Sequence, residues 1–327
     1  MSLGLTLAAV ALVLRGWHVW AAVFFSLALN HKQMALYYAL AFFAHMLGRA
    51  LRRGSVLLAA ARVVSLGVAV VGTFAVLWAP WLGSAEAALQ VARRLFPFAR
   101  GLFEDYVANF WCATNLLVKW KRFVPATTMP ALCAGVTLLA VAPAVCQQVA
   151  RPSRRGFVLC MMNCALAFFL FSFQVHEKSI LLPLLPATLL AAEEPLFAAW
   201  AQAIAAFSMW PLLKKDGQGV AYCALLLLHA VVSGGMGALL TGGLGALRGR
   251  PTHLALCASL AGAAALHAAE ALVPPPASKP FLHDALNAAY SAAHVLAALA
   301  YGTWRQWQCP ADEEEEGRLS RGKAKVA

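Results

Sequence analysis

Long apolar segments separated by short polar breaks recur along nearly the whole chain. Hydrophobic residues make up 61% of the 327 residues and charged residues only 12%, whereas a soluble domain carries about 25% charged residues. An apolar segment inside a bilayer must satisfy its backbone hydrogen bonds internally, as a helix does. The sequence therefore predicts an all-α polytopic membrane protein.

Eleven segments are candidate membrane spans, although several are short for a full crossing of about 20 residues. They lie at about 3–14, 17–29, 34–48, 56–80, 126–149, 157–173, 179–192, 195–213, 219–240, 252–273 and 281–304. We therefore expect residues 1–304 to form one multi-span transmembrane domain.

The arginines fall in short clusters between these segments, and alternate threading of the spans places all the clusters on one side. The clusters are Arg15, Arg49 with Arg52 and Arg53, Arg151 with Arg154 and Arg155, and Arg248 with Arg250. The positive-inside rule assigns that side to the cytosol. Loops of this kind explain the formal charge of +12, and we expect no nucleic-acid partner.

The same threading places residues 30–33, 81–125, 176–178, 214–217 and 274–280 on the opposite side, and the C-terminus in the cytosol. Residues 305–327 are predicted to be a cytosolic tail, whose acidic run Asp312–Glu316 is solvated. Lys323 and Lys325 have the spacing of a dilysine-type signal for retrieval to the endoplasmic reticulum. A tail that is basic by chance explains them equally well.

Three consecutive ionisable residues, His176, Glu177 and Lys178, interrupt the apolar stretch from Phe157 to Leu190. Charged groups at such a position are costly unless they are paired or face a cavity, so their default interpretation is a functional site. The alternative is an ordinary turn whose side chains extend to the membrane surface.

Residues 93–122 are too polar to span a membrane, yet they carry an apolar face that includes Phe103 and Phe110. This pattern predicts luminal helices that lie in the membrane interface. The adjacent Glu104 and Asp105 are conspicuous in a chain with only nine acidic residues outside its acidic run. They could line a site, or they could simply neutralise a basic helix.

Two predicted spans separate this stretch from His176, so both emerge on the same side of the membrane. A single site there could collect Arg94, Arg100, Glu104, Asp105 and the His176–Lys178 triplet. Cations and an imidazole at the membrane edge suit a lipid-linked phosphate, whose charge stays at the interface.

Carboxylates together with Asn109 or Trp111 suit a sugar, through hydrogen bonds to hydroxyl groups and stacking on a ring. The chain has no D-x-D motif, so the sequence does not support a divalent-metal site for a sugar nucleotide.

Three stretches resemble signatures of the dolichyl-phosphate-glucose-dependent α-1,3-glucosyltransferases of the endoplasmic reticulum. They are RLFPFARGLFEDYVANFWC at 94–112, FSFQVHEKSILLPLLP at 171–186 and LALNHKQMALYYALAFF at 27–43. This family adds the first and second glucoses to the lipid-linked oligosaccharide precursor of N-glycosylation. The KQMALYY motif at 32–38 is more similar to the enzyme that adds the first glucose.

The resemblance implies a multi-span lipid-phosphosugar glycosyltransferase fold, with a luminal active site in the endoplasmic reticulum membrane. It implies an inverting transfer of glucose from dolichyl-phosphate-glucose to Man9GlcNAc2-PP-dolichol, without a metal or other cofactor. A carboxylate would deprotonate the acceptor hydroxyl while dolichyl phosphate leaves.

By the same analogy, His176 and Lys178 lie near the donor phosphate, with Arg100 assisting. The substrate-binding residues are then His176, Glu177, Lys178, Arg100, Glu104, Asp105, Asn109 and Trp111. The family's probable catalytic aspartate lies in a luminal loop well upstream of the Lys-Gln-Met motif, and this chain begins only about thirty residues before it. We therefore expect the N-terminal part of the fold, with that aspartate, to be missing.

Three other interpretations stay open: transfer of the second glucose, a catalytically inactive fragment, and a transporter. A transporter would need ionisable groups near the middle of the bilayer and an internal repeat. The sequence shows no convincing repeat, and its ionisable cluster lies at span ends, which favours an enzyme that acts at the membrane interface.

Overall fold

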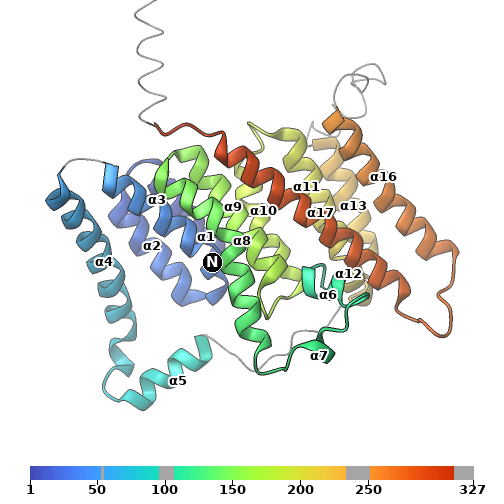
Figure 1. Ribbon diagram of the computed structural model, residues 1–327, viewed down its shortest axis with the longest axis horizontal. Helices are drawn as coiled ribbons and strands as arrows, with labels where there is room; N and C mark the ends of the chain where they lie inside the picture. Colours follow the sequence, from blue (N-terminus) through green and yellow to red (C-terminus); the bar gives the residue numbers. More distant parts are fainter. Residues whose placement is uncertain (53–54, 96–106, 233–250, 313–327) are drawn as a thin grey trace, which may run out of the picture. The chain divides into compact units, whose positions relative to one another are not determined.

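The computed structural model describes residues 1–52, 55–95, 107–232 and 251–312. These residues form helices and connecting segments, with no strand among them (Figure 1), which confirms the predicted all-α fold. They belong to two compact units, one made of Met1–Arg100, Ala142–Cys164 and Trp304–Ala327 and the other of Gly101–Val141 and Ala165–Thr303. The boundaries fall inside three helices, so each unit is described by the parts that it contains.

The first unit begins with a helical hairpin. Between α1 (Ser2–Leu14) and α2 (His18–His31), Gly16 has a φ of 81°, a conformation that glycine adopts without strain. The backbone N–H groups of Gly16 and Trp17 donate back to carbonyls of the last turn of α1, as in a Schellman helix end. The chain thus reverses at the break predicted between the first two spans.

Three further α-helices follow in the N-terminal part of this unit. The polar break after α2 becomes a 3₁₀ helix, η1 (Gln33–Tyr38), which leads into α3 (Ala39–Arg52). Of the residues in α4 (Val56–Trp78) only Ala59 is buried, so this apolar helix offers its surface to lipid. α5 (Ala85–Leu95) follows and buries none of its residues.

α3 and the C-terminal part of α8 (Met129–Ala150) pack closely through a glycine. A Cβ at Gly48 would lie 2.7 Å from the carbonyl oxygen of Val149, so a larger residue would force the helices apart. Beside this contact, Gln148 Nε2 donates to the Ser153 carbonyl at 3.0 Å and lies 2.7 Å from His45 Nδ1.

The arginine clusters of the first unit gather at one end. Asp312 accepts a hydrogen bond from Arg49 Nη1 at 3.1 Å and another from the backbone N–H of Arg154, the first residue of α9 (Arg154–Phe171), at 3.0 Å. Arg52 donates to the carbonyl of Ala150. This gathering agrees with the threading that places both clusters on one side.

The folded part of the chain extends further toward the C-terminus than the sequence predicts. α17 (Leu282–Trp307) continues beyond residue 304, and Gln306, Cys309 and Ala311 are buried. The predicted boundary of the tail at residue 305 is therefore too early. Asp312 is only 15% exposed, so its prediction as a solvated residue is wrong, because its carboxylate pairs with Arg49. Residues 313–327 lie outside the described residues.

A buried amide network joins α17 to its neighbours in the first unit. Gln306 Nε2 donates to the Ala144 carbonyl at 2.7 Å and to Gln147 Oε1 at 2.9 Å, both in α8. Asn163 Nδ2 of α9 donates to Gln306 Oε1 at 2.8 Å.

The second unit is built around α11, whose residues are mostly buried. The helices of this unit include α10 (Leu181–Leu189), α11 itself (Pro195–Ser208), α12 (Trp210–Lys215), α13 (Gly219–Val232) and α16 (Pro251–Leu272). The predicted span 195–213 is interrupted at Met209, where α11 ends and Pro211 opens α12. A proline lacks the backbone N–H that a continuous helix needs.

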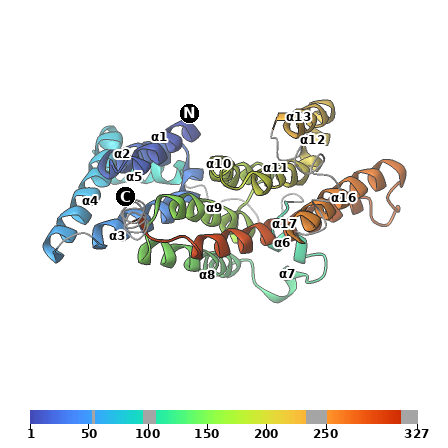
Figure 2. The ribbon, with the colours of Figure 1, turned by 90° about the horizontal axis from the view of Figure 1, so that it is seen from above.

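Hydrogen bonds between aromatic and polar side chains join three helices of this unit. Trp200 Nε1 of α11 donates to Ser259 Oγ of α16 at 2.8 Å, and the Tyr290 hydroxyl of α17 donates to the Ser259 carbonyl at 2.6 Å. α16 and α17 lie side by side in Figures 1 and 2.

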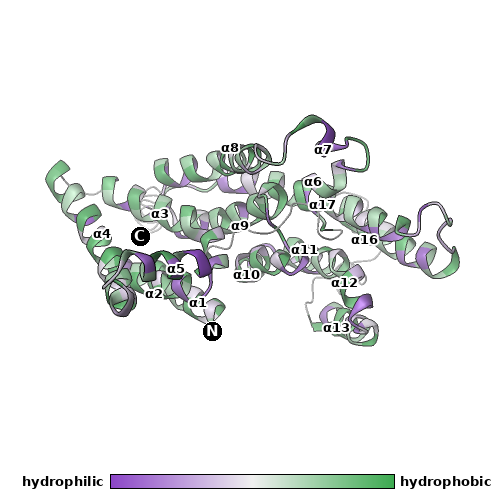
Figure 3. Ribbon diagram, turned by 90° about the horizontal axis from the view of Figure 1, so that it is seen from below, coloured by the Kyte–Doolittle hydropathy of each residue, from purple (hydrophilic) through white to green (hydrophobic). Residues whose placement is uncertain are grey.

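Among the described residues, five helices are long and apolar enough to cross a membrane: Gln33–Arg52, Val56–Trp81, Met129–Ala150, Arg154–Phe171 and Leu254–Leu272. Of the other six predicted spans, five correspond to helices that are shorter or, like α17, more polar. The sixth, 219–240, contains α13, and its residues after Val232 lie outside the described part of the chain. Hydrophilic residues gather at helix ends and connecting segments, for example between α16 and α17 (Figure 3). The chain is a multi-pass membrane protein.

Candidate functional site

The His176–Lys178 triplet forms a compact turn between α9 and α10. His176 has an extended backbone and precedes the 3₁₀ helix η3 (Glu177–Ile180), and its carbonyl accepts the N–H of Ser179 at 2.9 Å. Ser179 and Ile180 are buried, so they anchor the turn. His176 and Lys178 are exposed and Glu177 is half-buried. The turn thus presents an imidazole and an ammonium group outward at the end of a membrane-spanning helix.

Trp111 holds the segment after residue 106 against the end of α9. Its ring is 1% exposed, and its Nε1 donates to the carbonyl of Phe171, the last residue of α9, at 2.8 Å. The last carbonyls of a helix have no partner within the helix, so this bond satisfies a group that would otherwise be orphaned.

An aromatic cluster surrounds this bond. Trp111 makes edge contacts with Phe110 and Trp120, each with ring centroids 5.2 Å apart. Phe173, three residues before His176, packs against the same cluster. The structure therefore brings the chain on either side of Trp111 next to the connection that leads from α9 to the His176 turn.

Asn109 fixes the start of a short helix in this segment. Its backbone is extended, and its side-chain oxygen accepts the N–H of Cys112 at 2.8 Å, which caps α6 (Phe110–Thr114). Asn109 is 1% exposed. In this structure Asn109 and Trp111 both position the backbone, and a direct sugar contact by either one stays a prediction.

Three of the predicted site residues, Arg100, Glu104 and Asp105, lie outside the described residues, and so does half of the predicted apolar face of 93–122. The described parts of that stretch are the end of α5, then α6 and the short helix α7 (Trp120–Phe123). Their placement as interfacial helices stays a prediction.

A second polar cluster in the second unit was not predicted. Lys214 of α12 pairs with Glu270 of α16 and, at 3.3 Å, with Asp284 of α17, while Trp210 Nε1 donates to Glu270 at 2.6 Å. Burial alone would lower the pKa of Lys214, but its hydrogen bond to Glu270 and the two negative charges outweigh burial and raise that pKa.

The cluster joins the 214–217 and 274–280 connections, which the threading places on one side. The sequence did contain one signal for this cluster, because Glu270 is an acidic residue near the end of an apolar segment. The sequence alone does not say which cation it meets, because Lys214 lies 56 residues before it and the second carboxylate bound by Lys214, Asp284, lies 14 residues after it. We assign the cluster a structural role in holding α12, α16 and α17 together.

The sequence matches the ALG6, ALG8 glycosyltransferase family over residues 1–301. It is 47% identical over 232 residues to the probable dolichyl pyrophosphate Man9GlcNAc2 alpha-1,3-glucosyltransferase of Arabidopsis thaliana, covering 71% of this chain and 43% of the relative. The enzyme of that name from Gallus gallus is 44% identical over 233 residues, covering 71% of this chain and 45% of the relative.

The corresponding enzyme of Saccharomyces cerevisiae is 41% identical over 233 residues, covering 69% of this chain and 42% of the relative. The aligned part thus spans less than half the length of each of these relatives.

Proposed function

Because the chain belongs to the ALG6, ALG8 glycosyltransferase family, we propose that it takes part in the transfer of glucose from dolichyl-phosphate-glucose to a lipid-linked oligosaccharide. The proposed acceptor is Man9GlcNAc2-PP-dolichol and the proposed linkage is α-1,3, as in the names of the relatives. The proposed location is the endoplasmic reticulum membrane. Since these relatives are named for Man9GlcNAc2, we favour the first glucose over the second.

The observation that carries this proposal is the exposed His176 turn at the end of α9. A lipid-linked phosphate keeps its charge at the membrane surface while its chain lies in the lipid. His176 and Lys178 are exposed where a membrane-spanning helix ends, so they suit that phosphate. A cation near the leaving phosphate stabilises the negative charge that develops as the bond to glucose breaks.

The segment held by Trp111 forms the second part of the proposed site. Its attachment to Phe171 places it beside the connection to His176, so residues just before it could reach the sugar. Arg100 would assist the phosphate contact, and Glu104 and Asp105 would shape the cavity, together with Glu177 and the backbone around Asn109 and Trp111. We assign none of these residues as the base that deprotonates the acceptor.

The test is a profile of lipid-linked oligosaccharides in cells whose copy of this gene carries His176→Ala. A hydrogen bond between charged groups contributes about 1.5–3 kcal/mol, so we expect transfer to fall by about tenfold to a hundredfold. The unglucosylated species should then accumulate. His283→Ala provides a matched control, because His283 is a histidine in the first turn of α17 that bonds the Val273 carbonyl.

Accumulation of the monoglucosylated species would assign the chain to the second glucose instead. A normal profile in cells that lack the gene altogether would contradict the proposed function. A normal profile in the His176→Ala cells alone would contradict only the role of this residue.

A further inference from the structure

The turn between α2 and η1 presents two basic side chains, those of His31 and Lys32, on the surface of the first unit. Both residues are exposed, and neither side chain bonds or pairs with another group in the described part of the chain. The first 85 residues of the chain contain no Asp or Glu, so the local sequence supplies no carboxylate. The two side chains are therefore accessible to an anionic ligand.

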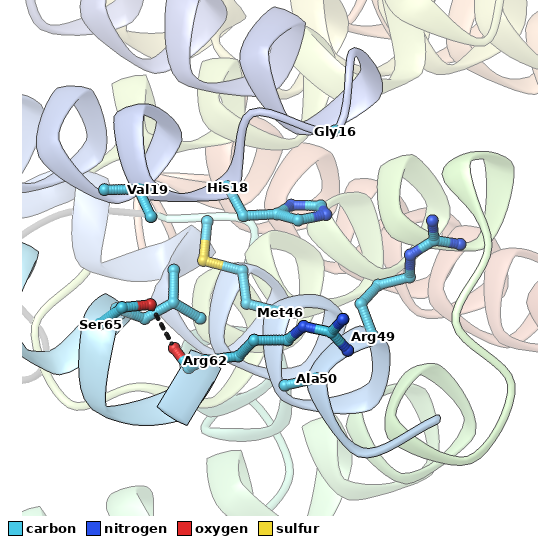
Figure 4. Close-up of a pocket in the computed structure, with 9 residues that line it drawn as sticks. Gly16, His18, Val19, Met46, Arg49, Ala50, Arg62 and Ser65 are labelled. Atoms are coloured by element: carbon cyan, nitrogen blue, oxygen red, sulfur yellow. Dashed lines mark hydrogen bonds between the residues drawn. The ribbon is translucent and has the colours of Figure 1, made fainter. Parts of the chain in front are cut away.

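The arginines that α3 and α4 bring to a small pocket differ in this respect, because they already have partners. Arg49 pairs with Asp312 at 3.1 Å, and Arg62 also has an interaction partner. Both line the pocket at the start of α2 (Figure 4), which is the opposite end of that helix from His31 and Lys32.

Hydrogen bonds hold the turn in place on both of its sides. Asn30 donates from Nδ2 to the Ser26 carbonyl at 2.9 Å and accepts the indole N–H of Trp78 from α4 at 2.7 Å. After the turn, the N–H of the buried Ala35 donates to the Lys32 carbonyl at 3.1 Å. The backbone that carries the two basic side chains is thus fixed, and a fixed site binds with a smaller loss of entropy.

The ends of two candidate spans indicate that this turn lies at the luminal membrane surface. Trp78 is near the end of the span Val56–Trp81, and tryptophan prefers the interface between membrane and water. The span Gln33–Arg52 begins directly after Lys32 and carries arginines in its last turn. The positive-inside rule assigns that last turn to the cytosol and the opposite end to the lumen.

The His31–Lys32 turn is similar to the His176 turn of the second unit in sequence and in local structure. Each presents an exposed imidazole and an exposed ammonium group close together in sequence, His31 with Lys32 and His176 with Lys178. In each, an extended residue precedes a 3₁₀ helix that runs directly into an α-helix. Buried residues of the 3₁₀ helix anchor each turn. Each unit thus contains one turn of the kind that suits a lipid-linked phosphate.

We propose that the His31–Lys32 turn binds the diphosphate of the lipid-linked oligosaccharide acceptor, while the His176 turn binds the donor phosphate. This inference rests on the function proposed above, whose acceptor is a dolichyl pyrophosphate, as in the names of the relatives. Donor and acceptor must be bound at the same time for transfer, and their phosphate groups repel each other. Each substrate therefore needs basic groups of its own.

The chemistry of the two side chains fits a diphosphate. The Lys32 ammonium group is a compact charge with three donors, and the His31 ring adds a further N–H donor. Lysine is a common phosphate ligand of this kind. A diphosphate carries more negative charge than a monophosphate, so it gains more from the ammonium group.

The test uses the purified 327-residue chain in neutral detergent, titrated with a short-chain isoprenyl diphosphate, the matching isoprenyl monophosphate or inorganic pyrophosphate. Stabilisation against thermal unfolding gives an apparent Kd for each probe. We expect Lys32→Gln to weaken binding of the isoprenyl diphosphate by about tenfold and that of the monophosphate by less than about twofold. Lys178→Gln should weaken binding of the monophosphate more than that of the diphosphate.

Two further variants serve as controls. Lys32→Arg keeps the charge and should bind the isoprenyl diphosphate within about twofold of the unchanged chain, because a guanidinium group also suits phosphate. Lys279→Gln removes an exposed lysine from another connection that the threading assigns to the lumen, and it should leave the binding of every probe unchanged. Because both lysines are exposed, these variants should fold.

Equal weakening by Lys32→Gln and Lys279→Gln would overturn the proposal, because it would indicate diffuse attraction to a basic surface. Unchanged diphosphate binding in Lys32→Gln would exclude the turn as the site. A loss of monophosphate binding in Lys32→Gln as large as the loss of diphosphate binding would overturn the assignment to the acceptor. Inorganic pyrophosphate that protects the chain as strongly as the isoprenyl diphosphate would overturn the lipid-linked ligand. These readouts measure binding, so they can fail while the oligosaccharide profile still supports glucose transfer.

Discussion

The indole N–H of Trp111 connects two parts of the second unit that are distant in sequence. It donates to a helix-terminal carbonyl 60 residues away, and the ring around it is buried by aromatic neighbours. Such a hydrogen bond contributes little net free energy to folding, because it replaces hydrogen bonds to water. A buried carbonyl that loses its donor, however, costs about 1–3 kcal/mol of stability. This hydrogen bond therefore helps the aromatic contacts to hold the segment beside the His176 turn.

Trp111→Phe should remove this donor while keeping most of the ring. We expect a loss of about 1–3 kcal/mol in the free energy of unfolding, measured by thermal unfolding in detergent. Trp120→Phe is the matched control, since its Nε1 bonds Thr114 Oγ1 at 2.9 Å in a half-buried position, where water can replace the bond. Unchanged stability with weakened substrate binding would instead support the direct sugar contact predicted from the sequence.

At the scale of elements, α17 is the helix whose role differs most from its prediction. The amide of its Gln306 meets α8 and α9 through three hydrogen bonds. Hydrogen bonds between membrane helices contribute about 0.6 kcal/mol each on average, and up to about 1.7. The three bonds together fix the register of α17.

Gln306→Leu should lower the free energy of unfolding by about 2 kcal/mol, because it removes three bonds and leaves the Asn163 amide and the Ala144 carbonyl without this partner. Gln308→Leu, two residues later, changes an exposed glutamine whose bond to Arg305 is local, and it should have little effect. The comparison is made by thermal unfolding of both variants. Equal losses would show that Gln306 acts through helix propensity or solubility and not through its network.

The sequence predicts which segments are helical better than it predicts where they stop. Apolar composition identifies the helices, because any buried apolar segment must pair its own backbone. The break at Met209 inside the predicted span 195–213 depends on Pro211, which was a visible signal. The burial of Cys309 and Ala311 had no such signal, because this segment packs next to residues far away in the chain; Asp312, for example, meets Arg49, 263 positions before it.

The candidate site, like the fold, has features that the sequence predicts and features that it does not. The exposure of His176 and Lys178 follows from their charge, and it was predictable from the polar interruption alone. The structural use of Asn109 and Trp111 was not, since a cap and a buried indole bond depend on local backbone geometry and on a distant carbonyl. A sequence pattern indicates which residue types lie in a site, but not which of their atoms already make hydrogen bonds within the protein.

At the scale of the whole molecule, the charge pattern predicts a sidedness that can be measured directly. The chain contains no N-x-S/T acceptor for N-glycosylation, so an inserted acceptor reports on one position only. An acceptor with flexible linkers in the Pro274–Pro280 connection should be glycosylated, because the threading places that connection in the lumen. The same insertion at Pro152, beside the arginine clusters that meet Asp312, should stay unmodified. The readout is a mobility shift that endoglycosidase treatment reverses. Modification at Pro152 would contradict the orientation that the proposed luminal donor-phosphate site requires.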